Sequence, residues 1–147
     1  MRNGTYAAVA ALVLLATGPA LAGEGAGMAV QDAWMRMLIP SRPAAGYFVL
    51  RNDGDAPRQL VGAQSPACGG LMLHRSLKEG GQDRMEMVKS VEVPAHGTVR
   101  FAPGGFHLMC MSPTAAVKPG GDVPITLRFA NGASVTASFA VKGATGE

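Results

Sequence analysis

The chain has few aromatic residues and, beyond residue 22, no apolar segment long enough to cross a membrane as a helix. Aromatic residues make up 5% of the 147 residues, and a membrane-spanning helix needs about 20 consecutive apolar residues. Lysine and arginine are scattered and not interleaved with aromatic side chains, so the formal charge of +3 does not indicate a nucleic-acid-binding surface. Hydrophobic residues make up 48% of the chain, which excludes a disordered protein.

The sequence also lacks a helical pattern. No stretch beyond residue 22 keeps an apolar period of 3.6 residues for three turns, and no internal repeat or low-complexity segment indicates a second domain. Gly, Pro, Asn and Asp instead separate short alternating segments. The predicted strands cover residues 30–38, 46–51, 59–63, 71–76, 85–88, 98–101, 106–111, 123–129 and 134–141. The last two flank Asn131-Gly132, a strong hairpin signal. The pattern predicts one all-β domain, a sandwich or a barrel.

Residues 1–22 have the features of a signal peptide. Arg2 supplies a positive start, residues 6–16 form an apolar segment, and Ala20-Leu21-Ala22 fits a small-x-small cleavage site. A retained N-terminal anchor is the alternative. Cleavage would leave residues 23–147 as a single exported domain, a length that suits one hydrophobic core.

Cysteine is scarce, with only Cys68 and Cys110 present. An even number of cysteines in an exported chain favours a disulfide. Such a bond would close a loop of roughly 40 residues and contribute about 4 kcal/mol in the chain-entropy model. Two buried free thiols are the alternative, and the sequence leaves both open.

Histidine is scarce as well, but two of the three histidines occur in a regular series with methionines. Met85 follows His74 by eleven residues, His107 comes twenty-two residues later, and Met109 lies two residues beyond it. Thioethers are poor ligands for hard cations and for zinc, whereas Cu(I) accepts them beside neutral imidazoles. Four neutral donors favour the +1 ion, because no thiolate or carboxylate offsets a higher charge. The series predicts a Cu(I) site gathered from three segments at one end of a sheet.

Each of these residues also has an ordinary structural role. Methionine fills irregular core space, especially in a chain short of aromatics, and a single histidine on a strand is more often a hydrogen-bonded structural residue than a ligand. Met109 and Met111 would share one strand face with His107, and only nearness favours Met109. Cys110 is expected on the opposite face and is therefore not expected to be a fifth ligand. His96 lies in a predicted turn and is expected to be exposed.

Other functional classes fit less well. A blue-copper electron carrier needs a cysteine thiolate with two histidines, and no histidine follows Cys110. The chain has no nucleophile motif and no convincing acid–base pair, so an enzyme is not expected. Two alternatives stay open: a copper buffer without a dedicated acceptor, and a secreted interaction domain in which these histidines and methionines belong to the core.

The four predicted ligands resemble the pattern of the PCuAC family of periplasmic copper chaperones, His-x10-Met-x21-His-x-Met. Residues 93–99 are similar to the family's P-A-G-G-T turn, residues 103–107 to its P-G-G-Y-H segment, and residues 121–129 to its closing hairpin. The likeness extends from about residue 30 to residue 141. Three features depart from the family pattern: His96 stands in place of a glycine, Glu86 stands where a basic residue is common, and the two cysteines are not typical.

The resemblance has specific implications. It implies a cupredoxin-like β-sandwich with Greek-key topology and an exposed Cu(I) site at His74, Met85, His107 and Met109. It further implies a periplasmic protein that delivers copper towards the CuA centre of cytochrome c oxidase. The expected partner is a copper-accepting membrane protein, either the oxidase or one of its assembly factors, and the chain itself is expected to be a monomer.

Overall fold

The computed structural model describes residues 24–25 and 27–145. All the regular secondary structure within these residues is β-strand. The predicted signal peptide, residues 1–22, lies outside the described residues. No membrane-spanning helix is found in the part of the chain that is described. The strands are β1 (Glu24–Gly25), β2 (Met28–Arg36), β3 (Ala44–Asn52), β4 (Arg58–Gln64), β5 (Cys68–Glu79), β6 (Gln82–Met87), β7 (Val91–Val93), β8 (Thr98–Phe101), β9 (Phe106–Pro113), β10 (Asp122–Phe129) and β11 (Ser134–Lys142).

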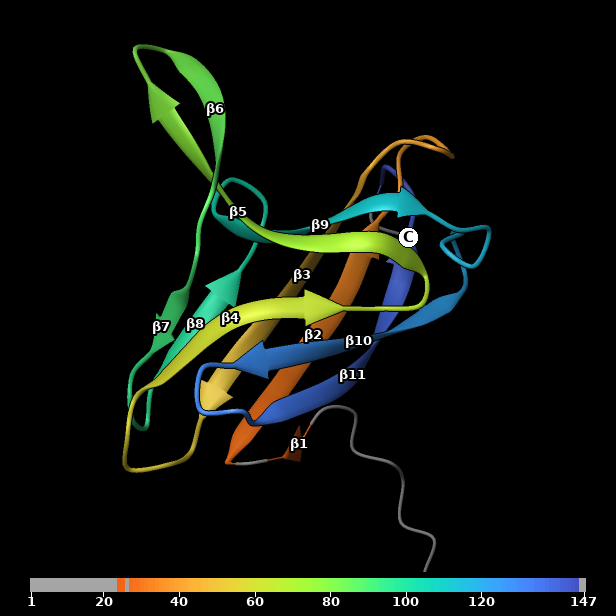
Figure 1. Cartoon of the computed structure of the whole chain (residues 1–147). Helices are drawn as coiled ribbons and strands as arrows, with labels where there is room; N and C mark the ends of the chain where they lie inside the picture. Colours follow the sequence, from red (N-terminus) through yellow and green to blue (C-terminus); the bar gives the residue numbers. More distant parts are fainter. Residues whose placement is uncertain (1–23, 26, 146–147) are drawn as a thin grey trace, which may run out of the picture.

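The strands form one sheet that curves back on itself into a flattened barrel, a β-sandwich (Figure 1). The hydrogen-bonded order is β6-β5-β9-β8-β3-β2-β11-β10-β4-β7, with further pairings of β9 with β3 and of β5 with β4. The β4–β5 contact closes the barrel through a single residue pair, Ala63 with Leu71. Beyond this contact β5 continues into the β5–β6 hairpin, which extends away from the body of the sandwich (Figure 1).

Each predicted strand is present, and the predicted hairpin is confirmed. β10 and β11 pair antiparallel around Asn131-Gly132, where Gly132 adopts a φ of 85°, a value that a residue with a side chain rarely takes. The sequence pattern missed β1 and β7, which are too short to show alternation. It also ended the strand predicted at residues 71–76 too early, because the corresponding strand, β5, continues to Glu79.

Alternation places one side of most strands in the core. Along β11, Val135, Ala137, Phe139 and Val141 are buried while the residues between them face outward. Phe48 on β3 packs edge-on against Phe139, with 5.6 Å between the ring centroids. Burying such apolar side chains contributes roughly 25 cal/mol per Å² and stabilises the two layers. The core therefore uses one strand face and leaves the other available for function.

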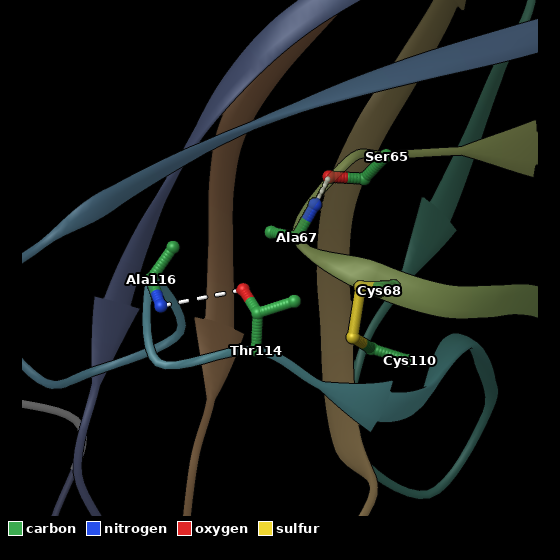
Figure 2. The surroundings of a disulfide bond; sticks show 6 residues. All are labelled: Ser65, Ala67, Cys68, Cys110, Thr114 and Ala116. Carbon is green, nitrogen blue, oxygen red and sulfur yellow. Dashed lines mark hydrogen bonds between the residues drawn. A yellow bond between two sulfur atoms is a disulfide. The ribbon is translucent and has the colours of Figure 1, made fainter.

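A disulfide joins Cys68 at the start of β5 to Cys110 in β9, with 5.4 Å between their Cα atoms (Figure 2). Cys110 is fully buried and belongs to the hydrophobic core. Its side chain points away from the face that carries Met109, as strand alternation requires. The bond therefore links β5 to β9 from the core side of these strands.

Candidate metal centre

Three neighbouring strands, β6, β5 and β9, bring the predicted ligands together. His74 on β5 lies directly opposite His107 on β9 and, on its other side, directly opposite Met87 on β6. Residues directly opposite each other on adjacent strands project from the same face of a sheet. The two histidines are therefore nearest neighbours across two strands.

The two remaining predicted ligands lie one step away on the same face. Met109 lies two residues from His107 and opposite Met72, and Met85 lies opposite Ser76. Residues two apart along a strand share a face. The histidines and the two predicted methionine ligands thus occupy adjoining positions on the three strands.

The prediction that the ligands lie where their strands end is wrong for His74. β5 extends from Cys68 to Glu79 and carries His74 in its middle. The residues consequently lie on a sheet face, close to the edge that β6 forms. The early end expected for the strand came from the polar composition of residues 78–83, which form the end of β5, the hairpin turn and the start of β6.

Both imidazole rings have a nitrogen without a protein partner. The ring centroids of His74 and His107 are 5.6 Å apart, and both His74 Nδ1 and His107 Nε2 are buried without a hydrogen-bond partner among the described residues. His107 Nδ1 lies 3.2 Å from the carbonyl oxygen of Gly105, which can only accept, so Nδ1 donates and the lone pair remains on Nε2. A buried polar atom without a partner costs about 1–3 kcal/mol. A metal ion would satisfy both nitrogens, and the Gly105 bond orients His107 as second partners of metal-bound histidines do.

The candidate site is closed on one side and open on the other. His107 is 3% exposed, whereas Met85 is 61% exposed and projects from the β5–β6 hairpin. Met109 is partly buried between these extremes. A rigid imidazole thus lies at the base of the site, and a flexible thioether lies where a partner protein could reach it.

Burial lowers the pKa of His74 below its usual value, and the neighbouring His107 lowers that pKa further when His107 is charged. Both causes disfavour the imidazolium form. The neutral ring is the form that ligates a metal. His74 is therefore held ready for a metal ion at a pH where an ordinary histidine would already be partly protonated.

Cu(I) affinity is expected to be constant above about pH 7.5 and to fall below about pH 6, because an imidazole must be neutral to bind the metal and a thioether does not titrate. The lowered pKa of His74 shifts its part of the decrease towards more acidic pH. Competition against a chromogenic Cu(I) chelator at a series of pH values measures the profile, with the chelator's own protonation as a correction. A decrease centred near about pH 8.5 would instead indicate a thiol ligand and would contradict the assignment.

An aromatic row borders the site on the side of β3 and β2. The ring of Tyr47 lies 6.5 Å from that of His107, and Trp34 lies 4.8 Å beyond Tyr47. The guanidinium of Arg36 lies over both rings, at 5.3 Å from Trp34 and 5.5 Å from Tyr47. Burial raises the pKa of Tyr47, so its phenol stays neutral. This side of the site therefore offers no anionic ligand.

Within the described part of the chain, no carboxylate completes the site. Glu86 stands between Met85 and Met87 in the sequence, but it points to the opposite face and forms an ion pair with Arg75. Among the described residues, no three histidine, cysteine or acidic side chains form a metal-binding group. The donors available here are thus the neutral imidazoles and the soft thioethers of nearby methionines, a set that suits Cu(I) better than zinc or a hard cation.

The structure adds two methionines that the sequence did not assign. Met87 lies opposite His74, and Met72 lies opposite Met109. The spacing Met85-Glu86-Met87 signalled a shared face, but only the pairing register reveals which methionine lies opposite a histidine. His96, by contrast, is exposed in its turn as predicted, where its ring lies 2.7 Å from the carboxylate of Asp55.

Comparisons with known proteins agree with this architecture. An experimental structure of the copper-bound PCuAC domain from PmoF2 matches with a TM-score of 0.68 at 21% identity, over 82% of this chain and 97% of that one. At this identity the likeness shows the fold. The Cu(I) form of DR1885 from Deinococcus radiodurans matches with a TM-score of 0.62 at 34% identity, over 77% of this chain and 78% of that one. The predicted cupredoxin-like sandwich and the resemblance to PCuAC proteins are confirmed: this is a PCuAC-type domain.

A protein-family match identifies the chain more narrowly. The family described as "Putative lipoprotein LpqE-like" matches residues 28–141, and the chain belongs to this family. A relative from Leifsonia xyli subsp. xyli, "Putative lipoprotein Lxx21020", is 34% identical over 121 residues, which are 82% of this chain and 72% of the relative.

Proposed function

We propose that this chain is an exported copper carrier that binds one Cu(I) through His74, Met85, His107 and Met109 and transfers it to an acceptor protein. One observation supports the proposal above the others. His74 Nδ1 and His107 Nε2 are buried, lie on adjoining rings and have no hydrogen-bond partner in the part of the chain that the structure describes. A secreted interaction domain with structural histidines would be expected to satisfy these atoms.

The donor set suits transport of copper without a change in its oxidation state. Imidazole and thioether donors carry no charge, so replacing one of them by a partner's ligand separates no charges. The exposed Met85 can leave first, while His107 at the base of the site leaves last. The cargo would thus pass as Cu(I) from donor to donor, and the chain would act as a carrier, not as an enzyme.

Export and location form part of the proposal. Residues 1–22 would direct secretion, and residues 23–147 would form the single mature domain. The lipoprotein description of the family and of the Leifsonia relative supports an exported protein. The disulfide between Cys68 and Cys110 agrees with an oxidising compartment such as the periplasm.

The proposed acceptor is the CuA centre of cytochrome c oxidase or one of its assembly factors. This acceptor follows from the resemblance to PCuAC chaperones, and the alternative is a copper buffer that serves no dedicated acceptor.

A Cu(I)-loaded mature chain is expected to transfer copper to a soluble apo CuA domain. A deletion strain is expected to lose oxidase activity at low copper and to recover it when copper is added. A strain that keeps its oxidase activity but becomes sensitive to copper would support the buffer instead.

A further inference from the structure

Two methionines without an assigned role lie beside His74. Met87 lies directly opposite it on β6, and Met72 lies two residues before it on β5. Met72 and Met87 are diagonal neighbours across these two strands, a separation that long side chains can bridge. Both share the face of the two histidines, so His74 has thioethers on two sides besides that of Met85.

Neither methionine serves the core. Met87 is 70% exposed and Met72 is 41% exposed, although methionine is usually buried. Both line one surface hollow of about 280 Å³, at the place where β5 separates from β4, and this hollow is also bordered by Lys89 and Arg128. Two soft donors are thus presented together in a solvent-accessible depression. On β5 and β6 they adjoin His74, whose Nδ1 has no hydrogen-bond partner among the described residues.

We propose that Met72 and Met87 form a second, weaker Cu(I) position that adjoins the first and through which the ion enters and leaves. The inference rests on the proposed function, since it concerns the same cargo. The position would be weaker because it adds only thioethers to a shared histidine. The positive charges of Lys89 and Arg128 at the hollow also disfavour a resting cation there.

The exchange step is a substitution of ligands on a Cu(I) ion that keeps its charge. A bond from copper to the sulfur of Met87 forms as the bond to the sulfur of Met85 breaks, while His74 remains bound. No electron and no proton is transferred, because thioethers are neutral before and after the step. A stepwise path of this kind lowers the barrier to release, because the ion does not lose several donors at once.

The test compares release rate with affinity. A Met72→Leu, Met87→Leu variant removes both sulfurs and nearly preserves side-chain volume. The matched control is Met111→Leu, which removes a partly buried methionine from the same face of β9, opposite Gly70 and not opposite a histidine. Stopped-flow transfer of Cu(I) from the loaded chain to a chromogenic chelator gives the rate, and equilibrium competition gives the affinity. We expect the double variant to release copper about 10-fold more slowly, which corresponds to about 1.4 kcal/mol in the barrier, with its affinity nearly unchanged.

A titration with labelled methionine methyl groups supplies a second readout. Signals of Met85 and Met109 are expected to shift fully by one equivalent of Cu(I), and signals of Met72 and Met87 to broaden over the same range, because one ion exchanges between the two positions. Equal release rates for the double variant and the wild type would overturn the inference. So would a parallel loss of affinity, since it would make Met72 or Met87 a ligand of the resting site. Failure of the proposed function itself would be distinct: the wild-type chain would bind no Cu(I) tightly.

Discussion

Replacing His107 and Met109 together by alanine is expected to weaken Cu(I) binding by more than about 100-fold, because loss of even a partner behind a metal ligand costs about 10–100-fold. The variant removes the buried imidazole whose Nε2 has no hydrogen-bond partner from residues 27–145, and with it the thioether two residues further along β9. His74 and Met85 would remain on β5 and β6 but would leave the ion with two donors from the proposed set.

Equilibrium competition with a Cu(I) chelator under anaerobic conditions measures this loss. His96→Ala is the matched control, because it removes a histidine that is exposed and contacts Asp55 away from the site. Unfolding of the copper-free variants by urea shows whether the fold is retained. X-ray absorption of the loaded wild type should show mixed nitrogen and sulfur scattering. Unchanged affinity in the double variant, or a shell without sulfur, would contradict the ligand assignment.

Replacing both cysteines by alanine is expected to lower the free energy of unfolding by about 4 kcal/mol, because the disulfide closes a loop with a sequence separation of 42 residues. Alanine is the informative substitute, since Cys110 is fully buried and a serine hydroxyl there would add a desolvation cost of its own. Urea unfolding of the oxidised wild type and the variant gives the difference. Wild type unfolded in reductant is the control that removes the bond without changing the sequence.

Copper affinity of the same variant is expected to stay within about threefold of the wild type, less than 1 kcal/mol, because Cys110 faces the core while Met109 faces outward. Thiol counting on the denatured, unreduced wild type should find no free thiol. Two free thiols would contradict the structure. A large loss of affinity with unchanged stability would show that the cysteines act in copper binding.

Local patterns were sufficient to predict most of the fold. Alternation of apolar and polar residues defines strands such as β10 and β11, and Asn131-Gly132 defines the turn between them because its geometry favours glycine. β7 escaped prediction because Val91–Val93 is too short to establish a period. The end of β5 escaped because residues 77–79 pair with β6 outside the core, where apolar alternation is not required.

The candidate site was accessible from the sequence only in part. The spacing of His74, Met85, His107 and Met109 indicated which donors belong together. It could not indicate register, which depends on how β5 meets β6 and β9, and so Met87 and Met72 were left unassigned. The hydrogen bond that fixes the free nitrogen of His107 also depends on the path of the backbone at Gly105, which no side-chain pattern specifies.

The two faces of β9 serve different purposes: one stabilises the fold and the other carries metal ligands. Leu108 and Cys110 point into the core, whereas His107 and Met109 point to the site. A substitution at an outward position can therefore change the preferred metal with little effect on folding: a histidine at position 109, for example, would move the donor set towards nitrogen and towards Cu(II). The insertion of a single residue at the start of β9 would disrupt both folding and metal binding, because it would turn His107 towards the core and Leu108 towards solvent. A point mutation on the outward face can thus change the cargo, whereas a change of one residue in the length of β9 would disturb the core and the site together.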